Sequence, residues 1–343
     1  MRAAVFQEFG GPGVLRIAEM PDPRPGPTEA LVRVRACGVN HLDLLVRRGE
    51  TPIKPPLPHI GGCEVAGEVV ALGPEASTDI QPGQQVAVAP YLFCGRCEYC
   101  LAGEETVCRR GDIIGLGRHG GFAEFVCVPA ANLVALPEGL SPEDAAAVSL
   151  SMLTAWHMLV TRARLRPGEM VLVLAAGSGV GSAAIQIACL TGARVIAAAS
   201  TDEKLARARE LGAHAVINYQ THDLLAEVRR LTGRRGVDVV VEHVGAATWE
   251  QSVAALTRNG RLVICGATSG TVGTTNLWHL FAKQLQLIGS YGGSRAELRT
   301  VLRLVAEGRL KPVIHACFGL DGVASAQQML EERRQFGKLL ILP

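Results

Sequence analysis

The stretch from Val171 to Ser200, VLVLAAGSGVGSAAIQIACLTGARVIAAAS, decides the fold of this 343-residue chain. It begins as an apolar run of strand length, turns through AAGSGVG, continues with apolar residues at helical spacing and ends in a second apolar run after Gly192. This order predicts one strand–helix–strand unit of a dinucleotide-binding fold, whose glycine turn and helix N-terminus face a pyrophosphate. We expect the coenzyme contacts of this turn to come from Gly177, Ser178, Gly179, Val180 and Gly181.

The glycine pattern alone does not settle the fold, because strict GxGxxG spacing requires glycine where Ala176 and Ser178 stand. A turn selected only for packing is the alternative. The continuation of the chain favours the dinucleotide fold, since helix-like segments separate further apolar runs at 215–218, 237–242, 261–265 and 285–290. This alternation predicts an α/β fold with a doubly wound parallel sheet.

The end of the second strand favours NADPH over NADH as the coenzyme. An NAD site usually places an acidic residue there to bind the ribose hydroxyls, and a carboxylate would repel the 2′-phosphate of NADPH. In this chain the strand runs into Ser200 and Thr201, with Lys204 one helical turn further on. Asp202 and Glu203 follow closely and serve either as helix N-terminal charges or as ribose ligands, so NADH remains the alternative.

Composition excludes several classes of partner. The 34 basic and 32 acidic residues leave a formal net charge of +2, and without a basic run we expect neither nucleic-acid nor membrane binding. No apolar segment reaches the roughly 20 residues of a membrane span, and the N-terminus MRAAVFQEFG lacks the features of a signal peptide. We therefore expect a cytoplasmic protein, in which ten cysteines indicate metal binding or burial rather than disulfides.

The pattern of apolar runs and loops divides the chain into three segments. Residues 1–152 consist of short alternating runs separated by proline-rich loops, which is typical of a β-rich domain. The dinucleotide-binding Rossmann domain occupies residues 153–292. Residues 293–343 are expected to return to the β-rich domain and to end in the apolar run Lys338-Leu339-Leu340-Ile341-Leu342.

Four cysteines form the strongest single motif, with the spacing C-x2-C-x2-C-x7-C. Four thiolates this close in sequence predict a tetrahedral zinc site with no open position for substrate, so the zinc would be structural. An iron–sulfur cluster and a set of unpaired or oxidised cysteines are the alternatives. The predicted ligands of this lobe at 94–108 are Cys94, Cys97, Cys100 and Cys108.

Several of these features together resemble the medium-chain dehydrogenase/reductase superfamily over essentially the whole chain. They are the β-rich N-terminal segment with its four-cysteine lobe, GGFAEF at 120–125, the Rossmann insert and the final GKLLI. The resemblance implies a Rossmann domain inserted in a GroES-like catalytic domain, and a homodimer or homotetramer paired through the edge strand of the dinucleotide domain. The superfamily contains zinc-dependent alcohol dehydrogenases as well as quinone oxidoreductases that use no catalytic zinc.

The positions that hold catalytic zinc in the alcohol dehydrogenases are mostly changed in this chain. They read Asn40 in GVN, Cys63 in GCE and Leu150, and only Cys63 is a zinc ligand as it stands. The GVN motif is similar to that of quinone and enal reductases. A non-standard zinc site built around Cys63 from His41, Asp43, His59 and Glu64 is the alternative.

We therefore expect an NADPH-dependent oxidoreductase that transfers hydride to a quinone or an α,β-unsaturated carbonyl compound without a catalytic metal. A zinc-dependent alcohol dehydrogenase and a non-enzymatic cofactor-binding protein are the competing hypotheses. The resemblance implies that Asn40 faces the reacting centre and that Thr154 packs near the nicotinamide. His41 is the first candidate for proton delivery, with His59 and Tyr91 as further candidates.

Further coenzyme contacts are expected beyond the carboxyl ends of the later strands. Tyr219 follows the third strand, where related NADPH-dependent reductases place a tyrosine against the adenosine phosphate. Val244 and Gly266 follow the fourth and fifth strands and are expected to act mainly through their backbone. By family analogy, the 2′-phosphate is also within reach of an exposed basic cluster near the C-terminus, Arg333, Arg334 and Lys338. Four further cysteines do not form a metal-binding spacing and are expected in the core: Cys37, Cys127, Cys189 and Cys317.

Overall fold

The strand, helix and strand predicted from Val171 onward are present in the computed structural model, which describes residues 1–343. They are β11 (Met170–Val173), α5 (Gly179–Leu190) and β12 (Arg194–Ala199). Ser178 begins α5 by accepting a hydrogen bond from the Gly181 N–H, which satisfies one of the free amides of the first turn. The helix begins where the glycine turn ends.

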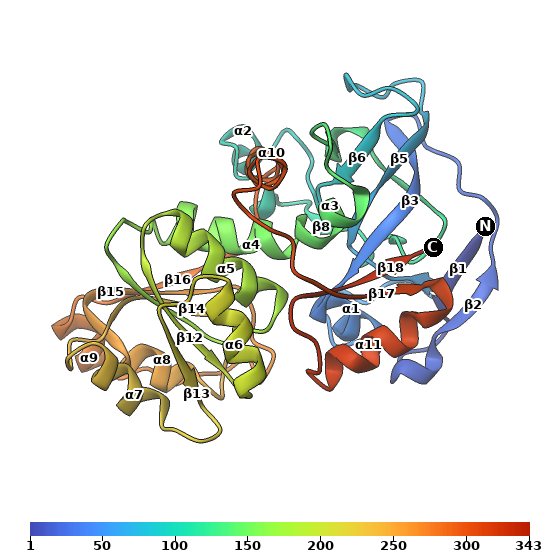
Figure 1. Cartoon of the computed structure of the whole chain (residues 1–343). Coiled ribbons are helices and arrows are strands. Elements are labelled where there is room, and N and C mark those ends of the chain that lie inside the picture. Colours follow the sequence, from blue (N-terminus) through green and yellow to red (C-terminus); the bar gives the residue numbers. More distant parts are fainter. The chain divides into compact units, whose positions relative to one another are not determined.

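This strand–helix–strand unit belongs to unit 2, which contains residues Thr154–Gly292. The remaining residues, Met1–Leu153 and Gly293–Pro343, form unit 1 (Figure 1). The chain thus leaves unit 1 once and returns to it once.

The sheet of unit 2 has six strands in the order β13-β12-β11-β14-β15-β16, and all neighbouring pairs are parallel. The order reverses between β11 and β14, so the predicted doubly wound α/β fold is confirmed. The fifth strand begins at Leu256, earlier than the predicted residue 261, because Leu256 pairs with Val237 before an irregularity in the register. The remaining strands are β13 (Ala215–Asn218), β14 (Val237–Glu242), β15 (Leu256–Ile264) and β16 (Gln286–Gly289).

Helices cover both faces of this sheet. Because crossovers between parallel strands are right-handed, α5 and α6 cover one face, and α7 and α8 cover the other. Both faces of the central strands are therefore buried, which accounts for their continuous apolar runs. No helix of the chain combines the length and the apolar character that crossing a bilayer requires. The other helices of unit 2 are the π-helix η4 (His157–Arg162), α6 (Asp202–Glu210), α7 (Leu224–Leu231), α8 (Trp249–Ala254) and α9 (Leu277–Ala282).

Unit 1 is built on a seven-stranded sheet with the path β10-β6-β5-β3-β18-β17, to which β9 is added by pairing with β3. A three-stranded sheet β2-β1-β4 and a two-stranded sheet β7-β8 complete it. Its strands are β1 (Arg2–Phe6), β2 (Arg16–Glu19), β3 (Glu29–Val39), β4 (His59–Ile60), β5 (Glu64–Leu72), β6 (Gln85–Val88), β7 (Tyr91–Leu92), β8 (Asp112–Ile113), β9 (Phe125–Pro129), β10 (Leu133–Ala135), β17 (Ile314–Gly319) and β18 (Lys338–Leu342).

Short helices join these strands, and α4 leads the chain from unit 1 into unit 2. The helices of unit 1 before this point are η1 (Pro12–Val14), α1 (His41–Arg48), α2 (Glu98–Leu101), η2 (Glu105–Val107), η3 (Ala130–Asn132), α3 (Pro142–Val148) and α4 (Ser151–Trp156). The C-terminal strand β18 lies inside the large sheet, parallel to β17 and antiparallel to β3. The final apolar run is thus a central strand.

The return segment after Gly293 is not all-β as predicted, because it also contains the helices α10 (Arg295–Ala306), η5 (Leu320–Gly322) and α11 (Val323–Glu331). Ser294 caps α10, and the Glu297 side chain accepts a hydrogen bond from the Ser294 N–H in return. The buried residues of α10 recur at helical rather than strand spacing. The sequence prediction missed this helical spacing of the buried residues and therefore missed α10.

Candidate functional site

The four predicted zinc ligands lie together in unit 1. All four Sγ atoms are within 4.8 Å of one another. The Sγ–Sγ distances are 3.5 Å between Cys97 and Cys100, 3.9 Å between Cys97 and Cys108, and 4.0 Å between Cys94 and Cys100. A tetrahedral site with Zn–S bonds of about 2.3 Å places its sulfur atoms about 3.8 Å apart. The cysteines therefore fit a zinc ion with all four positions filled by protein.

An arginine fastens this lobe to the start of α10. The Arg295 Nε donates to Glu105 Oε1 at 2.9 Å, and its backbone N–H donates to Glu105 Oε2 at 3.1 Å. The guanidinium also donates to the Ala131 carbonyl and lies 4.4 Å from the centre of the Phe93 ring. Glu105 lies between the third and fourth cysteines, so these contacts hold the four-cysteine loop in place.

Asn40 stands at the end of β3 and immediately before α1. Its Nδ2 donates to Glu64 Oε2 at 3.0 Å and to the Gly38 carbonyl at 3.1 Å. Its Oδ1 accepts from Lys338 Nζ at 2.7 Å. The orientation of this amide is therefore fixed on both sides, with the nitrogen toward the carboxylate and the oxygen toward the ammonium.

Lys338 and Glu64 form a buried ion pair beside Asn40. The distance from Lys338 Nζ to Glu64 Oε2 is 2.6 Å, and the two residues are 4% and 0% exposed. The second carboxylate oxygen of Glu64 accepts from the backbone N–H groups of Leu150 at 2.6 Å and Ser151 at 3.1 Å. Lys338 also donates to the Val39 carbonyl. Every charge in this pair therefore has several partners inside unit 1.

Lys338 is a correction to the sequence prediction, which placed it in an exposed basic cluster with Arg333 and Arg334. Its ammonium is buried and committed to Glu64, whereas Arg334 forms an ion pair with Glu332 at 2.6 Å. The prediction failed because the chain brings β18 beside β3, where Leu339 pairs with Val39, and so places the preceding Lys338 next to Asn40 and Glu64.

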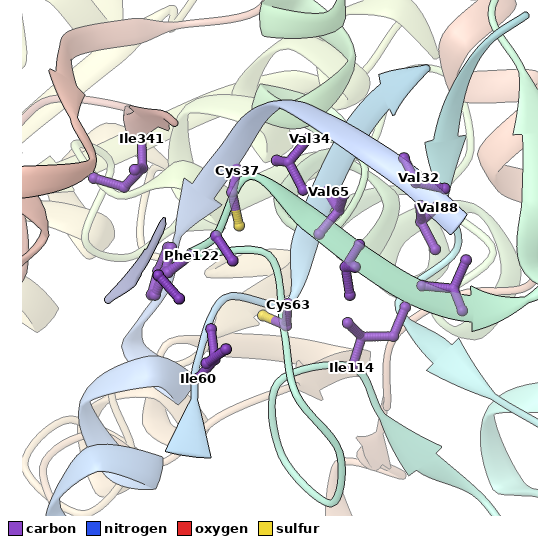
Figure 2. Close-up of a cluster of buried hydrophobic side chains, with 14 of the residues drawn as sticks. Val32, Val34, Cys37, Ile60, Cys63, Val65, Val88, Ile114, Phe122 and Ile341 are labelled. Atoms are coloured by element: carbon purple, nitrogen blue, oxygen red, sulfur yellow. The ribbon is translucent and has the colours of Figure 1, made fainter. Parts of the chain in front are cut away.

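Cys63 is packed in the hydrophobic core of unit 1. Figure 2 shows its sulfur among apolar side chains that include Ile60, Phe122 and Ile114. Cys63 is 1% exposed, and burial raises the pKa of its thiol well above the usual value. The thiol therefore favours its neutral form where no metal is bound.

The other residues of the alternative zinc site have their own partners. Asp43 accepts from the backbone N–H groups of Asn40 at 2.7 Å and Gly62 at 3.1 Å, and burial raises its pKa to about 7. His59 is fully buried, its Nε2 lies 3.0 Å from the Gly115 carbonyl, and burial lowers its pKa to about 4. These side chains do not gather with Cys63 into a group of three or more metal ligands, unlike the four cysteines of the lobe.

The remaining predicted catalytic residues differ in exposure. His41 is the first residue of α1 and is half-buried, and burial together with the charges of Arg48 and Arg333 lowers its pKa. Thr154 lies in α4 and is buried. Tyr91 is half-buried at the start of β7. Among the histidines considered for proton delivery, His41 alone is partly open, since His59 is enclosed.

The glycine turn of unit 2 is tightly packed. A Cβ atom added to Gly181 would lie 2.4 Å from the Ala175 carbonyl oxygen, so only glycine fits where α5 approaches the turn. Ala175 has a φ of 43°, a conformation that non-glycine residues rarely adopt. The predicted residues Gly177, Ser178, Gly179 and Val180 form the end of the turn and the first residues of α5. Such a turn suits a pyrophosphate at the helix N-terminus.

The residues after β12 are partly or fully exposed. Thr201 caps α6, while Ser200 and Lys204 are half-buried. The Asp202 carboxylate accepts from the Asn218 side chain at 2.8 Å, which ties it to the end of β13. Tyr219 follows directly and is 38% exposed, so it is not a buried strand-end tyrosine.

A buried carboxylate organises the loop after β14. Glu242 is fully buried and accepts from the backbone N–H groups of Val244 at 2.7 Å and Gly245 at 3.1 Å, and from the hydroxyls of Thr248 and Ser252. The Val244 carbonyl accepts from both the N–H and the hydroxyl of Ser269. The backbone groups of Val244, expected to contact the coenzyme, therefore already have partners within the chain.

His243 follows the fourth strand, in a loop whose coenzyme contacts are expected mainly through the backbone, and its side chain makes a contact that the sequence does not predict. Its Nε2 lies 3.0 Å from the Ser178 Oγ, which joins the loop after β14 to the cap of α5. Gly266 lies close by, since a Cβ there would be 3.5 Å from the His243 carbonyl oxygen. The signal in the sequence was a lone histidine at a strand end, which is weak by itself.

The expectation that Cys37, Cys127, Cys189 and Cys317 are core residues is correct in part. Cys37 is buried, but Cys127 and Cys189 are half-buried and Cys317 is exposed. Cys317 lies on β17, the edge strand of the large sheet, where one side is not covered by another strand.

Comparison with known proteins gives full-length matches. A family model described as an alcohol dehydrogenase GroES-like domain matches residues 26–138, and one described as a zinc-binding dehydrogenase matches residues 179–307. An alcohol dehydrogenase from Geobacillus stearothermophilus is 36% identical, covering 92% of this chain and 91% of that protein. A quinone oxidoreductase from Pongo abelii is 30% identical, covering 100% and 98%. The solved structure of an NAD-dependent alcohol dehydrogenase is 49% identical with a TM-score of 0.95, and each chain is covered completely.

Proposed function

Since this chain belongs to the medium-chain dehydrogenase/reductase superfamily and is an NAD(P)H-dependent oxidoreductase, we propose that it reduces quinones or α,β-unsaturated carbonyl compounds with NADPH and without a catalytic metal. The observation that carries the proposal is the buried Glu64–Lys338 ion pair and its bond to Asn40. A cation of the chain itself already neutralises the carboxylate, and the neighbouring Cys63 thiol is packed in the core.

Quinones and enones suit such a site because their own conjugation carries the charge that hydride transfer creates. The coenzyme gives up a hydride, the substrate gains it together with one proton, and NADP⁺ is released. We propose that the fixed amide of Asn40 contacts the substrate at the reacting centre and that Thr154 packs near the nicotinamide. His41 is the proposed proton source, because it follows Asn40 directly and is half-buried, whereas His59 is fully enclosed.

NADPH is proposed as the preferred coenzyme. The support is the hydroxyl-bearing residues Ser200 and Thr201, the nearby Lys204 and the exposed ring of Tyr219. Asp202, the carboxylate most able to select NADH, is bound by Asn218. Relatives described as NAD-dependent support NADH as the alternative. Calorimetric titration with both coenzymes tests the preference, and tighter binding of NADH would overturn it.

The zinc that this family binds is proposed to sit in the cysteine lobe with a structural role. The sulfur distances fit a site whose four positions are filled by Cys94, Cys97, Cys100 and Cys108. Elemental analysis of protein purified without chelator or added metal is then expected to give one zinc per chain. Two equivalents would indicate a second, catalytic site and would contradict the metal-free mechanism.

The activity itself is tested with a panel of acceptors. We expect NADPH oxidation with quinones or enones that a strong zinc chelator does not inhibit on the timescale of the assay. Oxidation of alcohols that the chelator abolishes would favour the second candidate, a zinc-dependent alcohol dehydrogenase, which the names of several relatives support. Steady turnover with neither quinone nor enone would refute the proposal.

A second copy of the chain is the proposed partner. The edge strand β16 pairs on one side only, with β15, and apolar side chains before it are exposed, including Leu277 at 70% and Trp278 at 68%. A homodimer would extend the sheet and cover this patch, and two dimers would make a homotetramer. Light scattering of Trp278→Glu is expected to show a smaller species than the wild type, whereas Ile53→Glu, an exposed apolar residue of unit 1, serves as the control. An unchanged mass for Trp278→Glu would contradict this interface.

A further inference from the structure

The four-cysteine lobe at 94–108 has little structure of its own. Its regular elements are the short helices α2 and η2, and every residue from Phe93 to Val107 is at least partly exposed. The chain enters the lobe after Leu92 and leaves it before Asp112, where β7 and β8 pair. Because the segment has no buried core, its shape depends on a bound metal and on its contacts with the rest of unit 1.

One side chain from outside the lobe contacts both of the segments that carry the cysteines. The Arg295 Nε and Nη2 atoms lie 2.9 and 2.8 Å from Glu105 Oε1, and the Arg295 backbone N–H donates to Oε2 at 3.1 Å. The guanidinium also lies 4.4 Å from the centre of the ring of Phe93, the residue before Cys94. Since Glu105 shortly precedes Cys108, the arginine contacts the chain just before the first ligand and just before the last.

Arg295 is itself fixed to the core of unit 1. It is the first residue of α10, which lies beside α3 and β10 and whose buried side chains include Leu298 and Val301. Its guanidinium donates a further hydrogen bond, at 2.6 Å, to the carbonyl of Ala131 in η3. The side chains of Arg295 and Glu105 are only 27% and 14% exposed, so solvent screens this ion pair less than a pair on the open surface. An exposed lobe is thus attached to a buried helix.

The position of Arg295 is unfavourable for α10 alone. Positive charge at a helix N-terminus opposes the helix dipole, and carboxylates are preferred there. Glu105 supplies such a carboxylate from the lobe, since it accepts from the first backbone N–H of α10 as well as from the guanidinium. This contact adds to the cap formed by Ser294 and Glu297. The lobe therefore completes the N-terminus of α10, while α10 holds the lobe.

We propose that Arg295 is a positioning residue of the metal site, which holds the two ligand-bearing segments in the arrangement that zinc requires. The affinity of the lobe for zinc then depends on Arg295 although it is not a ligand. The inference rests on the structural zinc of the proposed function. Because coupling between two sites is reciprocal, zinc bound in the lobe is expected to stabilise the first turn of α10.

The test is the zinc affinity of the full chain, measured by competition with a chromophoric chelator in the absence of substrate and coenzyme. Arg295→Met removes the guanidinium, Arg295→Lys keeps the charge without the two-pronged contact, and Glu105→Gln removes the carboxylate. Arg299→Met is the control for α10, because Arg299 is exposed on the same helix. Arg109→Met is the control for charge, because Arg109 is an exposed arginine of the lobe segment that pairs with Glu98.

We expect Arg295→Met to weaken zinc binding about tenfold. This is the lower end of the loss seen when partners around a metal site are removed, because Arg295 contacts the neighbours of the ligands and not the ligands. Arg295→Lys should lose less, and Arg295→Met combined with Glu105→Gln should lose little more than the larger single loss. Both controls should bind zinc as the wild type does. Unchanged affinity for Arg295→Met, or an equal loss in either control, would overturn the inference.

Hydrogen exchange on the wild type covers the case in which the variants fail to fold. The backbone amides of residues 295–298 are expected to exchange more slowly in the zinc-bound protein than after chelation, whereas those of α11 are expected to be unchanged. Equal exchange of the first turn of α10 in the two forms, or a similar change in α11, would contradict the coupling. If the wild type purified without chelator holds no zinc, the proposed zinc site itself fails. If it holds one zinc that Arg295→Met binds equally well, only the role of Arg295 fails.

Discussion

Replacement of Lys338 by methionine removes the cation that neutralises Glu64 and keeps the length of the side chain. Breaking a buried pair from one side costs about 3–5 kcal/mol, because the remaining charge stays buried. Glu64 is 0% exposed but keeps three donors, the N–H groups of Leu150 and Ser151 and the Asn40 amide. These donors reduce the penalty, so we expect about 3 kcal/mol, at the lower end of the range.

The assay is urea unfolding of Lys338→Met, Glu64→Gln and the double variant, followed by a signal from unit 1. If the pair is coupled as the geometry indicates, the double variant is more stable than the sum of the single losses predicts, by about 2 kcal/mol or more. A loss below about 1 kcal/mol for Lys338→Met, or strictly additive losses, would refute this account of the pair. Reductase activity is expected to fall with Lys338→Met, since Asn40 loses the partner of its Oδ1.

Three further predictions concern other parts of the chain. His59 is neutral when folded, with a pKa of about 4 against 6.5 when unfolded, so its contribution to stability is present above pH 6.5 and is lost as the pH falls toward 4. Between pH 7 and 4.5, the free energy of unfolding measured with urea should therefore fall by about 2–3 kcal/mol less for His59→Gln than for the wild type. Equal decreases in the two proteins would contradict this. Gly181→Ala should weaken NADPH binding at least tenfold in calorimetry, because the new Cβ meets the Ala175 carbonyl at 2.4 Å. Gly289→Ala, where a Cβ meets nothing within 4 Å, should bind normally, and equal affinities would disprove the tight turn. Zinc removal should make four additional thiols reactive toward a thiol reagent and expose residues 94–108 to protease, and an unchanged thiol count would argue against the lobe as the metal site.

The sequence was most informative where one local pattern determines the structure. The parallel strands of unit 2 are buried on both faces, so each is a continuous apolar run that can be recognised without its neighbours. The cap and glycines of α5 and the four-cysteine spacing are equally local, and the structure places all of them as expected. The helix α10 is not in the prediction, although its capping box and helical spacing are also local signals. The apolar run at the C-terminus is typical of a strand, and the whole segment from residue 293 is assigned to the β-rich domain on that basis.

The parts that could not be predicted depend on residues distant in sequence. Asn40 and Lys338 are 298 residues apart, and nothing near either residue indicates that they meet. The same holds for Ser178 and His243, which are 65 residues apart. The burial of Cys63 is the outcome that the sequence favours, but the strands and loops that enclose its thiol could not be identified from the sequence.

The central place of β18 in the large sheet has a consequence for the order of events during synthesis. Unit 2 is one continuous segment and is complete on the ribosome while unit 1 still lacks its closing strands. Until residue 338 emerges, the nascent chain holds Glu64 without its cation, and the end of β3 at residues 37–39 lacks its partner strand. Unit 1 is therefore the first to begin translation and the last to finish folding. A frameshift that changes residues 338–342 would remove the β18 partners of β3 and Glu64, which are translated far earlier.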